Sequence, residues 1–254
     1  MPTFRLMLEY DGSGFEGWQV QPGGRRTVQG VLEAAVAQVT GAAGFRLIGA
    51  GRTDAGVHAE GQVAGLSVET ALAAERLARA LNGVLPPDVA VRACATVPDG
   101  FHARYDATGK HYRYAIWNGA TRSPLREGRF HWVPSRLDVA AMGEGAAALA
   151  GDHDFASFQA AGSDVRSSER CLRRLDVTGE PRGEVWLEVE GPGFLRHMVR
   201  ILAGTLIDVG LGRTPADQIP AILAARDRSR AGRTAPAQGL TLVRVDYPEA
   251  PLPG

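Results

Sequence analysis

The chain has 254 residues, with an apolar fraction of 44%, a charged fraction of 22% and a formal net charge of zero. These values are typical of a globular protein with one large domain or two smaller ones, and no apolar run reaches the roughly 18 residues that a membrane helix needs. No signal-peptide pattern opens the sequence, and Cys94 and Cys171 lack Cys-X-X-Cys spacing. We therefore expect a reduced, cytoplasmic protein.

The first hundred residues predict a β-α-β-β-α-β order, which is the ferredoxin-like arrangement. Alternating apolar residues indicate strands, and apolar residues at helical spacing indicate helices. The predicted elements are a strand over 4–10, a helix over 27–40, strands over 45–50 and 61–68, a helix over 70–82 and a strand over 89–97. Thr27 is the expected N-cap of the first helix, and Gly83 with the Pro86-Pro87 pair ends the second.

A similar order follows residue 105. The predicted elements are a strand over 110–118, a helix over 137–149, a hairpin of strands 171–178 and 184–190, helices over 194–209 and 215–225, and a strand over 240–247. We therefore predict an α/β (α+β) fold of two ferredoxin-like halves, residues 1–105 and 106–254, with a mixed, mainly antiparallel central sheet. Ligand sites tend to form in clefts, and we expect one between the halves.

The net charge leaves the partner undecided. Most nucleic-acid-binding domains are basic overall, yet binding depends on where the cations lie. Lys110 is the one lysine among the 28 basic residues. Arginine suits phosphate contacts and stacking on bases, although a compositional bias is the simpler explanation. Two predicted loops, 119–135 and 159–170, carry arginines that are either phosphate contacts or solvated side chains: Arg122, Arg126, Arg129, Arg166 and Arg170.

Two cofactor patterns are absent or incomplete. The glycines from Gly12 to Gly17 fit a dinucleotide-binding spacing, but Trp18 follows where a helix should open. The six histidines are scattered, with no pair at metal-ligand spacing. We expect no nucleotide cofactor and no metal, and we expect Asp11 to shape the loop that follows the first strand.

The segment from Gly51 to Ala59 sets Asp54 in a tight turn after a predicted strand. Arg52 would keep the carboxylate ionised, and Gly56 is free to adopt a positive φ. An ionised carboxylate presented on such a loop is a credible nucleophile or base. The common alternative is an ordinary surface turn with an ion pair.

This segment resembles the catalytic-aspartate motif of the tRNA pseudouridine synthases of the TruA family. Five further blocks resemble the family in its own order: Tyr10–Gln19, Phe101–Arg104, Lys110–Tyr114, Gly193–Arg200, and Gly239-Leu240 leading to Val245–Pro248. The resemblance implies a pseudouridine-synthase fold and isomerisation of uridine to pseudouridine at positions 38, 39 and 40 of the tRNA anticodon stem-loop. It also implies a homodimer that needs no cofactor.

The resemblance assigns roles to single residues. Asp54 is the expected nucleophile, acting either at C1′ of the ribose or at C6 of the base, and Arg200 is its expected partner. Tyr112 is expected to stack on the flipped target base. The other expected substrate contacts are Arg52, His58, Arg104 and Arg196. Arg196 and Arg200, four residues apart, should share one face of the helix predicted over 194–209.

Two other functions compete with this interpretation. A non-catalytic RNA-binding protein of ferredoxin-like fold would share the order of elements, but the aromatic signature strand of RNA-recognition domains is missing and such a protein has no need for the Asp54 loop. A hydrolase with an Asp nucleophile would normally require a second carboxylate. Glu60 is the one acidic residue near Asp54 in the sequence.

Overall fold

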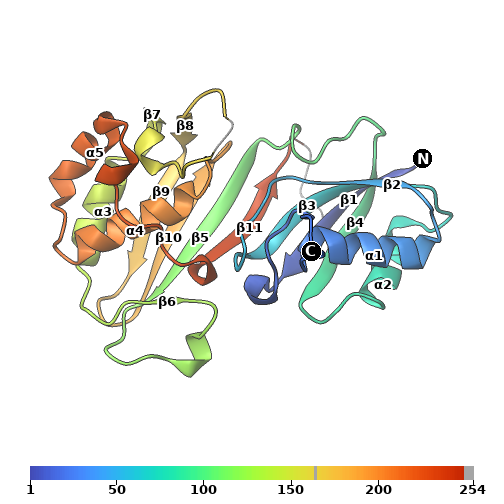
Figure 1. The fold of residues 1–254 in the computed structure, drawn as a ribbon, viewed down its shortest axis with the longest axis horizontal. Coiled ribbons are helices and arrows are strands. Elements are labelled where there is room, and N and C mark those ends of the chain that lie inside the picture. The colour runs from blue at the N-terminus through green and yellow to red at the C-terminus, as the bar shows by residue number, and fades with distance from the viewer. Residues whose placement is uncertain (163–164, 249–254) are drawn as a thin grey trace. The chain divides into compact units, whose positions relative to one another are not determined.

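The computed structural model describes residues 1–162 and 165–248 (Figure 1). The chain forms two compact units. Unit 1 contains Met1–Thr108 and the described part of Leu242–Gly254, and unit 2 contains Gly109–Thr241. The division of the chain into functional halves at residue 105 stays a prediction. Among the residues described, no helix is long and apolar enough to cross a membrane.

Unit 1 begins with the predicted β-α-β-β-α-β order, which is confirmed. Its elements are β1 (Thr3–Tyr10), α1 (Val28–Thr40), β2 (Phe45–Gly49), β3 (His58–Val68), α2 (Ala74–Asn82) and β4 (Val89–Val97). Strand β1 pairs antiparallel with both β3 and β4, and β3 also pairs antiparallel with β2. The final strand, β11 (Leu240–Asp246), neighbours β3.

Local sequence explains where the two helices of unit 1 begin. The Thr27 hydroxyl accepts the N–H of Gly30 at 3.3 Å, so the predicted cap of α1 is confirmed. Helix α2 begins at Ala74, later than the predicted residue 70. The hydroxyl of Thr70 instead accepts the N–H of Leu72 at 3.2 Å, and such a local bond competes with helix formation.

One face of β1 supplies the core of unit 1. Phe4, Leu6, Leu8 and Tyr10 are each at most 2% exposed, because alternate residues of a strand point to the same side. Apolar residues of α1 and α2 are buried with them: Leu32, Val36, Leu77 and Leu81. The sheet of unit 1 is therefore a rigid platform for the loops at the ends of its strands.

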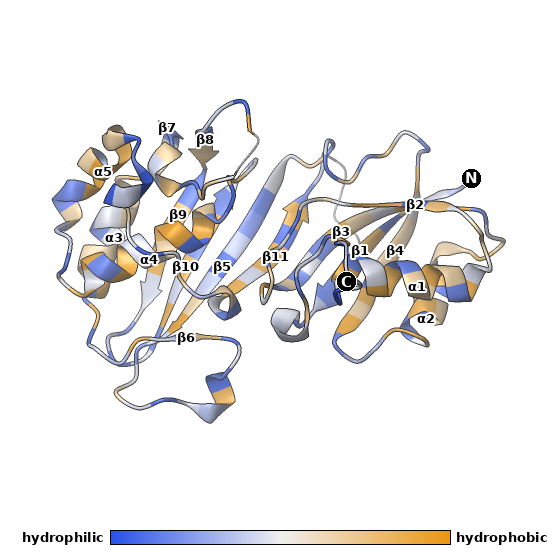
Figure 2. Ribbon diagram, in the orientation of Figure 1, coloured by the Kyte–Doolittle hydropathy of each residue, from blue (hydrophilic) through white to orange (hydrophobic). Residues whose placement is uncertain are grey.

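Unit 2 combines a mainly antiparallel sheet with three helices in the described residues, which confirms the predicted α/β class (Figure 1). Its elements are β5 (Gly109–Trp117), β6 (His131–Trp132), α3 (Val139–Ala147), β7 (Gly151–Asp154), β8 (Glu169–Leu172), β9 (Arg174–Gly179), β10 (Glu184–Gly191), α4 (Met198–Gly210) and α5 (Ile219–Ala225). Strand β10 pairs antiparallel with β5 and β9, β6 runs parallel to β5, and β7 pairs with β8. Figure 2 shows the apolar character of α4, most of whose side chains are buried.

Three predicted boundaries in unit 2 are wrong. The helix predicted over 215–225 begins at Ile219, after a 3-10 turn over Ala216–Gln218. Helix α4 begins at Met198 and not at residue 194, because His197 adopts a left-handed conformation with φ 58°. Arg196 therefore lies before the helix and does not share a helical face with Arg200. The strand predicted over 171–178 is divided at Arg173 into β8 and β9.

Candidate active site

Asp54 lies in the turn that joins β2 to β3 in unit 1. Its carbonyl accepts the N–H of Val57 at 3.1 Å, and Gly56 closes the turn with φ 78°. That conformation favours glycine because a side chain would clash with the backbone. Asp54 is a partly exposed residue and Arg52 is an exposed one.

The glycine-rich block after β1 packs against the outside of this turn. The N–H of Trp18 donates to the carbonyl of Thr53 at 3.0 Å, and the N–H of Gly56 donates to the carbonyl of Phe15 at 3.3 Å. Gly17 has φ 96°, and a Cβ there would lie 2.8 Å from the carbonyl oxygen of Thr53. The glycines that formally resembled a dinucleotide loop thus allow two backbone segments of this chain to approach closely.

A buried histidine holds the start of the same block. The ring of His58 is 1% exposed, and its Nδ1 accepts the N–H of Gly12 at 3.0 Å. Asp11 Oδ1 lies 3.3 Å from the same nitrogen and accepts the N–H of Ser13 at 3.0 Å. The expected role of Asp11 in shaping the loop is confirmed, whereas contact between His58 and substrate stays a prediction.

The inner side of the Asp54 turn is held by a polar cluster that the sequence analysis missed. The hydroxyl of Tyr10 lies 2.8 Å from the hydroxyl of Thr53. Gln62 Nε2 donates to the carbonyl of Gly51 at 3.0 Å and lies 3.5 Å from the Tyr10 oxygen. A glutamine within the apolar sequence of β3 was the one available signal, because buried polar side chains need partners.

In unit 2, the two tyrosines of β5 point to one side of their strand, as predicted. The ring of Tyr112 contacts the edge of Phe194, with centroids 5.2 Å apart, and is 8% exposed. Tyr114 is fully buried and donates to the carbonyl of Pro236 at 2.9 Å. Burial raises the pKa of Tyr114 well above its usual value. The base-stacking role of Tyr112 stays a prediction.

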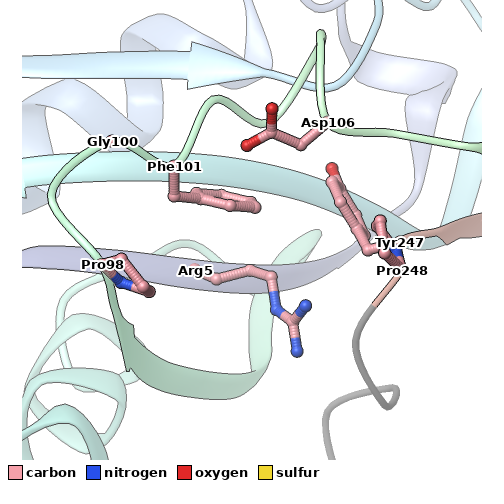
Figure 3. Close-up of a pocket in the computed structure, with 7 residues that line it drawn as sticks. All are labelled: Arg5, Pro98, Gly100, Phe101, Asp106, Tyr247 and Pro248. Atoms are coloured by element: carbon pink, nitrogen blue, oxygen red, sulfur yellow. The ribbon is translucent and has the colours of Figure 1, made fainter.

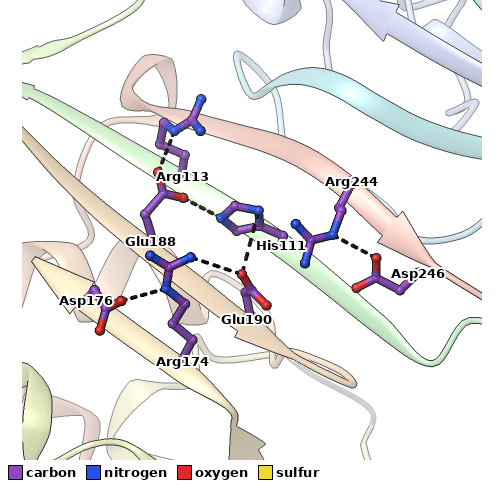
Figure 4. A network of polar contacts seen from close by, with 8 residues as sticks. All are labelled: His111, Arg113, Arg174, Asp176, Glu188, Glu190, Arg244 and Asp246. Carbon is purple, nitrogen blue, oxygen red and sulfur yellow. Dashed lines mark hydrogen bonds and ion pairs between the residues drawn. The ribbon is translucent and has the colours of Figure 1, made fainter. Parts of the chain in front are cut away.

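The other side of β5 carries charged groups that join it to β10 and β9 (Figure 4). His111 and Arg113 both contact Glu188, and Arg113 Nε donates to Glu188 Oε1 at 2.7 Å. Arg174 bonds to both Asp176 and Glu190, at 2.6 and 3.3 Å. In unit 1, Arg244 and Asp246 of β11 form a separate pair at 2.8 Å. The alternation predicted for residues 111–114 is therefore confirmed.

The arginines expected to contact substrate have different surroundings. Arg200 is partly buried, and its Nε donates to the carbonyl of Ala235 at 2.8 Å. Arg196 is exposed and donates to the carbonyl of Ala161 at 3.0 Å. Arg104, in unit 1, is also exposed. The pairing of Arg200 with Asp54 stays a prediction, as do the substrate contacts of Arg52, Arg104 and Arg196.

A cavity of about 290 Å³ in unit 1 lies apart from the Asp54 turn (Figure 3). Arg5, Phe101 and Tyr247 line it, and the rings of Phe101 and Tyr247 are 5.4 Å apart. The Tyr247 hydroxyl donates to the carbonyl of Ala103 at 2.6 Å. Two of the blocks recognised in the sequence, around residues 101–104 and 245–248, therefore pack together. Within the described chain, no group of three or more metal-ligating side chains is arranged to hold a metal.

Comparison with known proteins shows the family to which the chain belongs. The family model for tRNA pseudouridine synthases matches residues 6–106 and 146–248, so the chain belongs to that family, whose members are isomerases that convert uridine to pseudouridine. The chain is 48% identical over 252 residues to tRNA pseudouridine synthase A of Myxococcus xanthus, with 99% of this chain and 94% of the relative covered. It is 50% identical over 254 residues to the protein of that name from Roseiflexus sp. (strain RS-1), with 98% and 92% covered.

Proposed function

We propose that this protein isomerises uridine to pseudouridine in tRNA, at positions 38, 39 and 40 of the anticodon stem-loop. The observation that carries the proposal is the similarity to tRNA pseudouridine synthases A over 97–99% of the chain. The positions in tRNA rest on the sequence resemblance. In the reaction, the N1–C1′ bond breaks, the uracil turns, and a C5–C1′ bond forms. The C5 proton leaves and N1 gains a proton, so substrate and product have the same mass.

Asp54 is the residue that we propose to be catalytic, as a nucleophile at C1′ or at C6. Two observations support it. Asp54 is a partly exposed residue, and backbone hydrogen bonds from Trp18 and Gly56 hold the turn in place. A fixed backbone limits the orientations that the carboxylate can adopt and so favours reaction with a bound substrate.

The base and its phosphates need further contacts, because a uridine must leave its stack before it can react. We propose that Tyr112 stacks on the flipped base and that Arg200 pairs with Asp54. The edge contact with Phe194 supports the first role, since it fixes the plane of the Tyr112 ring. The remaining proposed substrate contacts are Arg52, His58, Arg104 and Arg196.

We also propose a homodimer in the cytoplasm, from the family resemblance. Free Cys94 and Cys171 agree with a reducing compartment. Sedimentation of the purified protein tests the dimer, and a single monomeric species at micromolar concentration would contradict it.

The central experiment is to incubate the protein with unmodified tRNA and map pseudouridines by a chemistry selective for them. We expect conversion at positions 38 to 40 with no change in mass. Conversion elsewhere would contradict the proposed positions and leave the isomerase activity in place. Release of free uracil would favour a hydrolase, and tight tRNA binding without conversion would favour the RNA-binding alternative.

A further inference from the structure

We propose that the Tyr10–Thr53–Gln62 cluster is a positioning device for the catalytic turn, acting through the backbone of residues 51–53 on Asp54. This proposal rests on the proposed function, since it takes Asp54 to be the reacting group. The three side chains are not proposed to touch substrate. They are positioning residues, and their effect should appear in the chemical step and not in tRNA binding.

The hydrogen bonds of the cluster connect β3 and β1 to the Asp54 turn. Gln62 Oε1 accepts the N–H of Val63 at 3.1 Å, which fixes the amide so that Nε2 is the donor. Nε2 then points to the carbonyl of Gly51 and to the oxygen of Tyr10. The Tyr10 hydroxyl also lies 2.8 Å from Thr53 Oγ1, and either hydroxyl can donate the proton of that bond. The side chains thus form a connected hydrogen-bond network that joins β3 and β1 to the turn.

Two side chains of this hydrogen-bonded cluster, Tyr10 and Gln62, belong to rigid strands, whereas Asp54 lies outside regular structure. Tyr10 ends β1 and Gln62 lies within β3, and the ladder between these strands includes the pairs Leu8–Gln62 and Tyr10–Ala59. The register shifts between Leu8 and Tyr10, which is the kind of irregularity that re-aims a side chain at the end of a strand. The turn is therefore held at residues 51 and 53, immediately before Asp54.

Thr53 is fixed from two directions. Its hydroxyl contacts Tyr10 on the inner side, and its carbonyl accepts the Trp18 N–H on the outer side. The side chain is 6% exposed, so water does not readily replace a lost partner. Loss of the inner bond would leave a buried hydroxyl without its partner, and the turn could then shift relative to the strands.

Burial makes the cluster a permanent structural link and not a proton-transfer group. Tyr10 is 2% exposed, and burial raises the pKa of its phenol to about 12, although hydrogen bonds from Thr53 and Gln62 act in the opposite direction. The phenol therefore keeps its proton throughout the range of a normal activity assay. Removal of the hydroxyl should lower the height of the pH–rate profile and leave its shape unchanged.

The test compares Tyr10→Phe with Tyr247→Phe. Each substitution removes one phenolic hydroxyl that bonds within unit 1, but Tyr247 bonds to Ala103, outside the Asp54 turn. We expect Tyr10→Phe to lower kcat for pseudouridine formation about 10- to 100-fold, because displacements of about 1 Å have effects of that size. The dissociation constant for tRNA should change less than about twofold. Tyr247→Phe should lower the melting temperature by about as much as Tyr10→Phe does, but it should leave kcat unchanged.

Two substitutions of Thr53 test the same Tyr10–Thr53 hydrogen bond from its other partner. Thr53→Val keeps the shape and loses the hydroxyl, whereas Thr53→Ser keeps the hydroxyl. We expect Val to lower kcat as Tyr10→Phe does and Ser to restore most of it. The Tyr10→Phe/Thr53→Val double variant should be no worse than the single variants, because both remove the same bond.

Three results would overturn the proposal: full kcat in Tyr10→Phe, an equal loss in Tyr247→Phe, or a loss that appears only in tRNA affinity. Additive losses in the double variant would also contradict it. These results differ from failure of the proposed function, in which the unaltered protein itself would produce no pseudouridine.

Discussion

Gly17→Ala should destabilise the protein and displace the Asp54 turn. Two costs add. Gly17 has φ 96°, and a non-glycine residue at positive φ costs about 1–2 kcal/mol. The new Cβ would lie 2.8 Å from the carbonyl oxygen of Thr53 and 3.3 Å from the carbonyl carbon of Asp54, and such overpacking costs about 1–3 kcal/mol more. We therefore expect a total loss of about 2–5 kcal/mol in the free energy of unfolding.

Gly23→Ala is the matched control, because Gly23 has φ 90° and no atom within 4 Å of an added Cβ. Gly23→Ala therefore has the energetic cost of a positive φ but no close contact of the new Cβ. Thermal unfolding of both variants should separate the two costs: Gly17→Ala should melt at least about 2 °C lower than Gly23→Ala. At a temperature where both are folded, only Gly17→Ala should lose pseudouridine formation. Equal melting temperatures and equal activities would refute the role given to the Gly17–Thr53 contact.

Four other outcomes are expected. Asp54→Asn should abolish pseudouridine formation while tRNA binding persists, and turnover near the unaltered rate would contradict the catalytic role. Tyr112→Phe should retain more activity than Tyr112→Leu, since stacking contributes about 1–3 kcal/mol per base; equal and severe losses would point to the hydroxyl. Arg200→Met should lower kcat strongly, and unchanged kcat would remove its proposed partnership. Burial and the Arg233 cation lower the pKa of His131 to about 4, so the unfolded chain binds this proton first as pH falls from 6.5. Stability should therefore fall between pH 6.5 and 4, less steeply in His131→Gln, and identical slopes would contradict this.

The sequence predicted those features that depend on residues close together along the chain, such as helix caps and strand alternation. The Thr27 cap, the alternation of β1 and the opposite sides of residues 111–114 all follow from spacing along the chain. The start of α4 did not, because apolar residues at helical spacing continue through Leu195, and the left-handed conformation of His197 is not visible in the pattern. That error moved Arg196 onto a helix to which it does not belong.

The sequence predicted the catalytic turn of the candidate site as a motif, but it did not predict the side chains that hold this turn in place. The turn around Asp54 was recognised from nine consecutive residues. One of its supports comes from far away in sequence, since Tyr10 and Thr53 are 43 positions apart. Periodicity in a single sequence carries no information about such pairs. Tyr10 was interpreted as the end of a strand and the start of a family block, and Gln62 as part of another strand.

The membership of most of β11 in unit 1 has a consequence for synthesis on the ribosome. Residues 242–248 belong with Met1–Thr108, while unit 2 is one continuous stretch between them. Gly61 of β3 approaches β11 so closely that a Cβ there would lie 2.4 Å from the carbonyl oxygen of Val243. Because the N-terminus is translated first, the unit that bears Asp54 must wait for the last strand to emerge. Unit 2 can therefore fold before unit 1 has received β11. Until β11 pairs with it, one edge of β3 stays open to chaperones.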